Sequence, residues 1–102
     1  MKTTTIKELQ KLNNPIIIDI RNNYNYSASH IPSALNIPES ILKEMPAKYL
    51  SKKETYYLYC SIGNKSQELS KFLNELGYNC YNIKGGYHEY RTNFRELNIF
   101  KK

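Results

Sequence analysis

The run Pro15-Ile16-Ile17-Ile18-Asp19-Ile20 restricts the possible folds of this chain more than any other segment. Its residues are almost all apolar and β-branched, without the polar positions that a half-exposed strand carries on alternate residues. Such a strand has to be covered on both faces, as the central strands of a parallel sheet are. The run is therefore predicted to be a buried strand of a parallel sheet.

The remaining sequence alternates between strand and helix patterns. Residues 66–76 place Leu69, Phe72, Leu73 and Leu76 at helical spacing, and Gly77 follows as a C-terminal cap. Strand–helix alternation predicts an α/β domain with a mostly parallel sheet of about five strands. Strands are expected at 3–5, 16–20, 34–37, 55–59 and 80–83, and helices at 6–12, within 22–29, at 41–45 (ended by Pro46), at 66–76 and at 87–93.

Length and composition indicate one ordinary globular domain over residues 1–102. The chain is 24% charged and 40% hydrophobic, and no apolar run approaches the length of a membrane span. Residues 1–14 lack the apolar centre of a secretory signal, so a cytoplasmic protein without membrane contact is expected. Two cysteines do not suggest a disulfide scaffold. No histidine–cysteine cluster has the spacing of metal ligands, and neither a metal nor another cofactor is predicted.

The net charge of +6 favours an anionic substrate or an acidic partner. Lys52-Lys53 and Lys101-Lys102 are isolated pairs, and no nucleic-acid-binding motif is present. A solvated basic surface is therefore favoured over nucleic-acid binding.

The segment Cys60-Ser61-Ile62-Gly63-Asn64-Lys65-Ser66 joins the strand at 55–59 to the helix at 66–76. Such a loop can direct several backbone N–H groups toward one point, and the helix dipole adds positive potential there. A cysteine in this place is biased toward the nucleophilic thiolate. Gly63 allows the loop to curl, and Ser66 is a candidate helix cap. Cys60 is the predicted nucleophile, and Ser61, Ile62, Gly63, Asn64, Lys65 and Ser66 are predicted to bind substrate.

Other polar residues follow the strands at the same edge of the predicted sheet. Asp19 and Arg21 end one strand, and Gly85-Gly86 follows the last. Ligands of open α/β sheets bind at these carboxyl ends. Asp19 and Arg21 are candidates for the pocket rim, although a structural ion pair that fixes the strand end is the favoured interpretation.

Four segments in order resemble the rhodanese (sulfurtransferase) domain, and together they span nearly the whole chain. Ile18-Asp19-Ile20-Arg21 is similar to the first motif, and residues 30–38 (HIPSALNIP) to the second, with Ser33 in place of glycine. Residues 60–66 are similar to the active loop. Gly85-Gly86-Tyr87 with Tyr90 is similar to the last motif, with tyrosine in place of its final tryptophan. The resemblance implies the rhodanese-like fold, with helices on both sides of the sheet.

The resemblance also implies a chemistry. Cys60 would take the outer sulfur of a small anionic donor such as thiosulfate and carry it as a persulfide to a thiol or a sulfur-carrier protein. Loop N–H groups would stabilise the anion. Lys65 would hold a sulfonate oxygen where many relatives have arginine, and lysine lacks arginine's planar fork. This difference leaves the choice of donor open.

Two other functions stay open. One is a non-catalytic binding or regulatory module on the same fold. The other is a phosphatase-like or arsenate-reducing enzyme, which the six residues from Cys60 to Lys65 disfavour, since related phosphatases have a loop one residue longer. Cys80 is predicted to be a core residue, His30 a turn residue that bonds to the backbone, and His88 an exposed residue.

Overall fold

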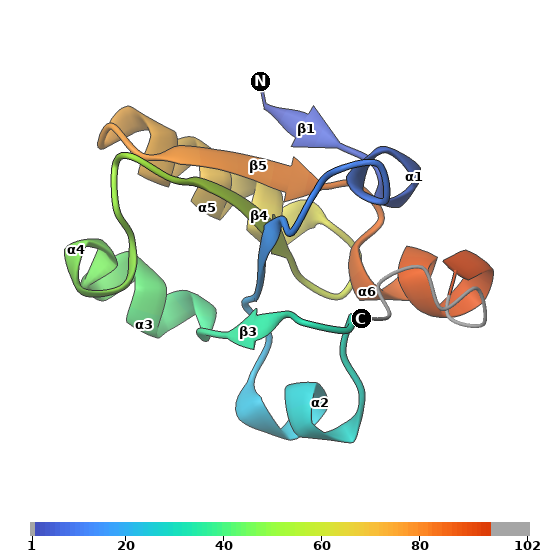
Figure 1. The fold of residues 1–102 in the computed structure, drawn as a ribbon. Coiled ribbons are helices and arrows are strands. Elements are labelled where there is room, and N and C mark those ends of the chain that lie inside the picture. The colour runs from blue at the N-terminus through green and yellow to red at the C-terminus, as the bar shows by residue number, and fades with distance from the viewer. Residues whose placement is uncertain (1, 95–102) are drawn as a thin grey trace.

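The computed structural model describes residues 2–94, and its centre is a five-stranded sheet (Figure 1). The strand order is β1-β5-β4-β2-β3, and every neighbouring pair is parallel. The α/β architecture with a parallel sheet is therefore confirmed. The strands are β1 (Thr3–Thr4), β2 (Ile16–Asp19), β3 (Leu35–Asn36), β4 (Thr55–Tyr59) and β5 (Asn79–Ile83).

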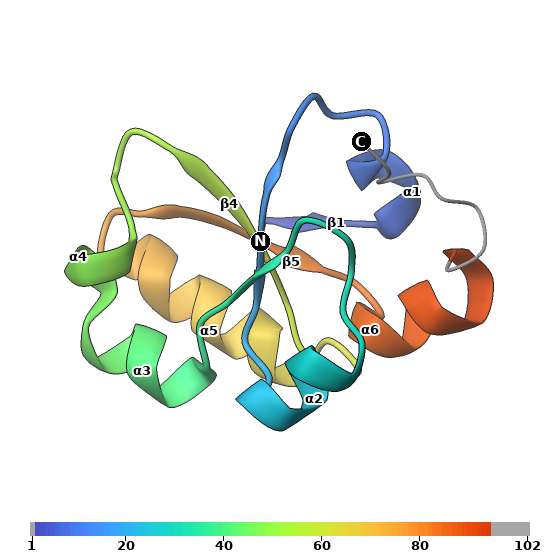
Figure 2. The ribbon, with the colours of Figure 1, turned by 60° about the horizontal axis from the view of Figure 1, so that its bottom comes forward.

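Helices cover both faces of the sheet, as predicted. Figure 2 shows α3, α4 and α5 on one side and α1 and α6 on the other. Among the described residues, no helix has the length and apolar character needed to cross a bilayer. The helices are α1 (Ile6–Leu9), α2 (Asn23–Ala28), α3 (Glu39–Glu44), α4 (Pro46–Tyr49), α5 (Asn64–Glu75) and α6 (Gly86–Glu89), and a π-helix (Tyr90–Phe94) follows α6.

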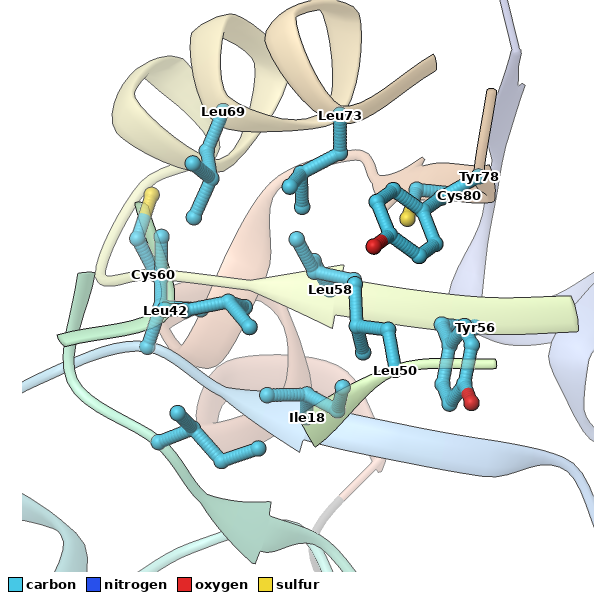
Figure 3. Packing of buried hydrophobic residues seen from close by; sticks show 12 residues of the cluster. Ile18, Leu42, Leu50, Tyr56, Leu58, Cys60, Leu69, Leu73, Tyr78 and Cys80 are labelled. Carbon is cyan, nitrogen blue, oxygen red and sulfur yellow. The ribbon is translucent and has the colours of Figure 1, made fainter. Parts of the chain in front are cut away.

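The isoleucine run of β2 is apolar because each face of the strand meets a different core. Ile18 belongs to the cluster that lies against α5, which also contains Leu58 and Leu73 (Figure 3). Ile17 belongs to the cluster on the opposite face, together with Tyr59. Both isoleucines are 1% exposed. Each such side chain contributes roughly 1.5–3 kcal/mol by its burial.

The helix predicted at 41–45 is α3, which begins two residues earlier, at Glu39, and ends before Pro46 as predicted. The sequence analysis missed α4, which has Pro46 as its first helical residue. Proline is favoured at that position because its missing N–H has no intrahelical partner there in any case. Leu50 then donates its N–H to the Pro46 carbonyl at 2.8 Å and turns its buried side chain into the core.

The helix predicted at residues 6–12, which is α1, is shorter than its apolar spacing predicts. It ends at Leu9, and Leu12 is 41% exposed. Thr5 and Glu8 form a complete capping box at its start, which satisfies two backbone donors. Local capping therefore fixes this short helix, while Ile6 and Leu9 supply its buried face.

Candidate active site

Cys60 lies directly after β4, where the chain turns into α5. Its sulfur accepts the backbone N–H of Gly63 at 3.1 Å and that of Ser66 at 3.4 Å. The residue is only 5% exposed. Gly63, just before α5, and Ser66, in its first turn, thus direct two backbone donors at one sulfur atom, an arrangement that suits an anion.

Two glycines give the loop its path. Gly63 precedes α5 with a φ of +104°, in the left-handed region that suits a residue without Cβ. Gly86 lies against the Cys60 carbonyl, and a Cβ there would collide with that oxygen. The N–H groups of Tyr87 and His88 donate to the carbonyls of Cys60 and Ser61 at 2.8 and 2.9 Å. The first turn of α6 therefore holds the start of the loop in place through two backbone hydrogen bonds.

Ser66 does not cap the helix as predicted. The helix begins two residues earlier, at Asn64, and Ser66 is fully buried in its first turn. Its hydroxyl lies 3.3 Å from the Cys60 sulfur and donates a hydrogen bond to Oδ1 of Asn82. The side chain faces inward because Ser66 lies on the buried face of α5, at helical spacing from Leu69 and Leu73.

Asn82 is a site residue that the sequence analysis missed. It lies in β5, opposite Leu58 of β4, and is 4% exposed. The available signal was a lone polar side chain two residues after Cys80, on the strand face that α5 covers. A polar group on a buried strand face requires a hydrogen-bond partner, and Ser66 supplies it.

A cleft of roughly 540 Å³ opens in front of Cys60. It brings together the predicted residues Arg21, Cys60, Ser61, Ile62, Asn64 and Lys65; Gly63, Ser66 and Asp19 are not in its lining. Lys65 is exposed there, and Glu39 of α3 adds a carboxylate. The sequence analysis did not single out the further lining residues, which are Ile20, Asn22, Asn25, Pro38, Glu39 and Ser40.

Asp19 and Arg21 form a buried ion pair beside the cleft. Their side chains are 0% and 8% exposed, and Nη2 of Arg21 lies 2.7 Å from Oδ2 of Asp19. Tyr59 donates its hydroxyl to the same carboxylate at 2.6 Å. Burial and the neighbouring Asp19 raise the pKa of Tyr59, which keeps the phenol a donor. The guanidinium also lies over the Tyr87 ring, 4.2 Å from its centroid.

Neither histidine lies in the cleft lining. Nδ1 of His30 is 2.7 Å from the Tyr26 carbonyl, and the two rings are stacked at 3.8 Å. The prediction of a turn histidine bonded to the backbone is confirmed, as is the exposure of His88. Within residues 2–94, no group of three or more histidine, cysteine, aspartate or glutamate side chains is arranged to hold a metal ion.

Cys80 is fully buried in the core beneath α5, and burial raises its pKa to about 11 (Figure 3). Because the pKa is raised, the folded protein holds Cys80 as the protonated thiol. The contribution of Cys80 to the free energy of unfolding is therefore full below the thiol pKa of the unfolded chain, and it declines as the pH rises toward 11. We therefore expect native protein at pH 8 to lose a single thiol to iodoacetamide, at Cys60, and both thiols only in denaturant. Peptide mapping that finds Cys80 alkylated in native protein would contradict this.

Comparison with known proteins finds similar sequences over most of the chain. The family model described as Rhodanese-like domain matches residues 3–93. The adenylyltransferase and sulfurtransferase uba4 of Ogataea parapolymorpha is 35% identical over 83 residues, which cover 80% of this chain and 21% of that protein. The tRNA uridine(34) hydroxylase of Photorhabdus laumondii is 32% identical over 98 residues, covering 88% of this chain and 28% of that protein. The chain thus spans less than a third of these relatives.

Solved structures show the same arrangement of elements. A rhodanese-like domain protein from Staphylococcus aureus has a TM-score of 0.78 at 28% identity, covering 86% of this chain and 89% of that one. The human single-domain sulfurtransferase TSTD1 has a TM-score of 0.81 at 24% identity, covering 91% and 97%. The second likeness concerns the fold alone.

Proposed function

Since this chain belongs to the rhodanese-like domain family, we propose that it is a sulfurtransferase in which Cys60 carries sulfur as a persulfide. The observation that carries the proposal is the position of the Cys60 sulfur, which receives two backbone N–H groups while its residue lines an open cleft. The sulfurtransferase named among the curated relatives supports the same chemistry.

In the first half-reaction the Cys60 thiolate attacks the outer sulfur of thiosulfate. The new S–S bond forms as the bond between the two donor sulfurs breaks, and sulfite leaves with that electron pair. The enzyme keeps a persulfide anion, so three negative charges stand on each side of the step. The N–H groups of Gly63 and Ser66, which already point at the sulfur, support this anionic intermediate.

In the second half-reaction a nucleophile attacks the outer sulfur of the persulfide and restores the thiolate. The cleft has a volume of roughly 540 Å³, which is more than a small donor anion fills. That volume supports a larger acceptor, such as a thiol held on a small molecule or on a carrier protein. A cytoplasmic setting and the absence of a bound cofactor are parts of the same proposal.

The test is intact-protein mass spectrometry after incubation with excess thiosulfate. We expect a gain of one sulfur atom, and its removal by cyanide with formation of thiocyanate. Polysulfide and mercaptopyruvate serve as second and third donors. A protein that gains no sulfur from any of them has the non-catalytic role instead. Hydrolysis of an aryl phosphate or turnover of arsenate, without sulfur uptake, would replace the proposal with the phosphatase-like activity.

Lys65 is proposed to hold the donor's sulfonate, because it is exposed on the cleft, in the first turn of α5. We expect Lys65→Met to raise the KM for thiosulfate by roughly threefold to tenfold through the loss of one charge in a partly solvated site. Lys65→Arg should keep or lower that KM, since the guanidinium grips two oxygens. An unchanged KM in Lys65→Met would remove Lys65 from the donor site. Lys71, exposed further along α5, is the matched control for charge alone.

A further inference from the structure

The side chains of Cys60, Ser66 and Asn82 are connected in the protein interior, and the donor in one contact decides the donor in the next. The Ser66 hydroxyl carries a single hydrogen, and that hydrogen is donated to Oδ1 of Asn82. The lone pairs of the same oxygen then face the Cys60 sulfur, 3.3 Å away. In this arrangement only Cys60 can supply a hydrogen between sulfur and oxygen, and Oδ1 of Asn64, 3.9 Å from the sulfur, is the other acceptor for the thiol. When the thiol donates to Ser66, the hydrogen bonds run from the thiol to the hydroxyl and from the hydroxyl to the carboxamide oxygen.

A thiolate requires the opposite direction. Without its proton the sulfur only accepts, so the Ser66 hydroxyl has to turn its hydrogen toward Cys60. That rotation leaves Oδ1 of Asn82 without its Ser66 hydrogen bond in a buried place, which costs free energy. Rotating the carboxamide by half a turn removes the conflict, because its NH₂ group then donates to the Ser66 oxygen. An asparagine is suited to this role because it offers an acceptor in one orientation and a donor in the other.

We propose that Asn82 is a positioning residue that controls, through the Ser66 hydroxyl, whether Cys60 is held as a thiol or as a thiolate. The three residues are 5%, 0% and 4% exposed, so water does not readily replace these bonds. Asn82 acts on Cys60 through the oxygen of Ser66. The consequence for sulfur transfer rests on the proposed function, but the protonation of Cys60 does not.

Charged groups near Cys60 act on the same equilibrium and have to be held constant. Arg21, Glu39 and Lys65 line the cleft from the segment after β2, from α3 and from α5. Asp19 is already paired with Arg21. Substitutions at Asn82 and Ser66 change none of these groups, which makes their effect on Cys60 separable from that of the cleft charges.

The experiment is the pH profile of Cys60 alkylation by iodoacetamide, followed by mass spectrometry of the full chain. Asn82→Asp offers only acceptors and adds a negative charge, so it holds the Ser66 hydrogen away from the sulfur. We expect the midpoint of the profile to rise by about one pH unit or more. Asn82→Leu removes the carboxamide without adding charge and frees the Ser66 hydrogen for the sulfur, so the midpoint should fall.

The same substitutions in a Ser66→Ala background decide the mechanism. There the effect of Asn82→Leu should vanish and that of Asn82→Asp should shrink to its direct charge effect. Asn79→Asp is the matched control, since it adds the same charge to the same strand at a residue that bonds Thr55 and Lys2, and it should leave the midpoint in place. Equal shifts in both backgrounds, or none in either, would overturn the proposal.

If Asn82→Asp fails to fold by circular dichroism, the Asn82→Leu pair decides alone. A midpoint that Asn82→Leu leaves unchanged beside an intact Ser66 would be the overturning result. Alkylation needs no sulfur donor, so a protein that shows this coupling but takes up no sulfur would refute the proposed function and keep the role of Asn82.

Discussion

Cys60→Ser is expected to abolish sulfur uptake and to lower the rate of thiocyanate formation at least about a thousandfold, as removal of a covalent nucleophile does. Serine keeps the shape of the side chain but has a far weaker nucleophile at neutral pH. The loop donors from Gly63 and Ser66 remain in place, so the loss isolates the sulfur atom itself. The measurements are intact mass after thiosulfate and steady-state thiocyanate production.

Cys80→Ala is the matched control, because it removes the chain's other cysteine from the core. We expect it to lower stability by roughly 1–2 kcal/mol through a small cavity, with sulfur uptake retained. Sulfur gained by Cys60→Ser and lost in Cys80→Ala would reverse the assignment of the carrier. Sulfur retained in both single variants would mean that the mass gain is not a persulfide on one defined residue.

Arg21→Met is expected to lower the free energy of unfolding by about 3–5 kcal/mol, because it leaves a buried charge without its partner. Asp19 is 0% exposed and receives the Arg21 backbone N–H, Nε and Nη2. The guanidinium also donates to the Ser29 carbonyl at 2.7 Å. Urea unfolding at pH 7 measures the loss.

The combined variant Asp19→Asn with Arg21→Met provides the control. It removes both charges, so it should regain part of the stability that Arg21→Met alone loses. A loss below about 1 kcal/mol in Arg21→Met, the range of an exposed ion pair, would show that water reaches the Asp19 carboxylate. Sulfur uptake should persist in protein that remains folded, since the pair fixes the strand end rather than the reacting sulfur.

Local sequence predicted most of the sheet and the place of Cys60. The β2 run is apolar at successive residues, and only a strand covered on both faces uses such a pattern, which the two clusters around Ile17 and Ile18 confirm. The predicted strands at 16–20 and 55–59 agree with β2 and β4 to within one residue at each end. The Cys60 loop was predictable because a strand, a cysteine, a glycine and a helix follow one another within a short stretch.

Helix ends were less predictable, because they depend on contacts that the local pattern does not contain. Pro46 is compatible both with the end of one helix and with the first residue of the next. The buried position of Leu50 agrees with a helix that begins at Pro46. Ser66 is similarly compatible with a cap position and with a buried position in the first turn. It occupies the second, because Gly63 takes the cap position and α5 begins at Asn64.

The sequence by itself determined most of the order of strands and helices and the position of Cys60 in the loop between β4 and α5, since these follow from patterns of neighbouring residues. Only the tertiary structure decided which distant polar groups meet. Tyr59 reaches Asp19 across 40 residues, and Ser66 reaches Asn82 across 16. Both contacts depend on the register between β4 and its neighbours and on how α5 lies against the sheet. Register is a cooperative property of packing, so a shift of one residue would turn Asn82 to the opposite face, away from Ser66.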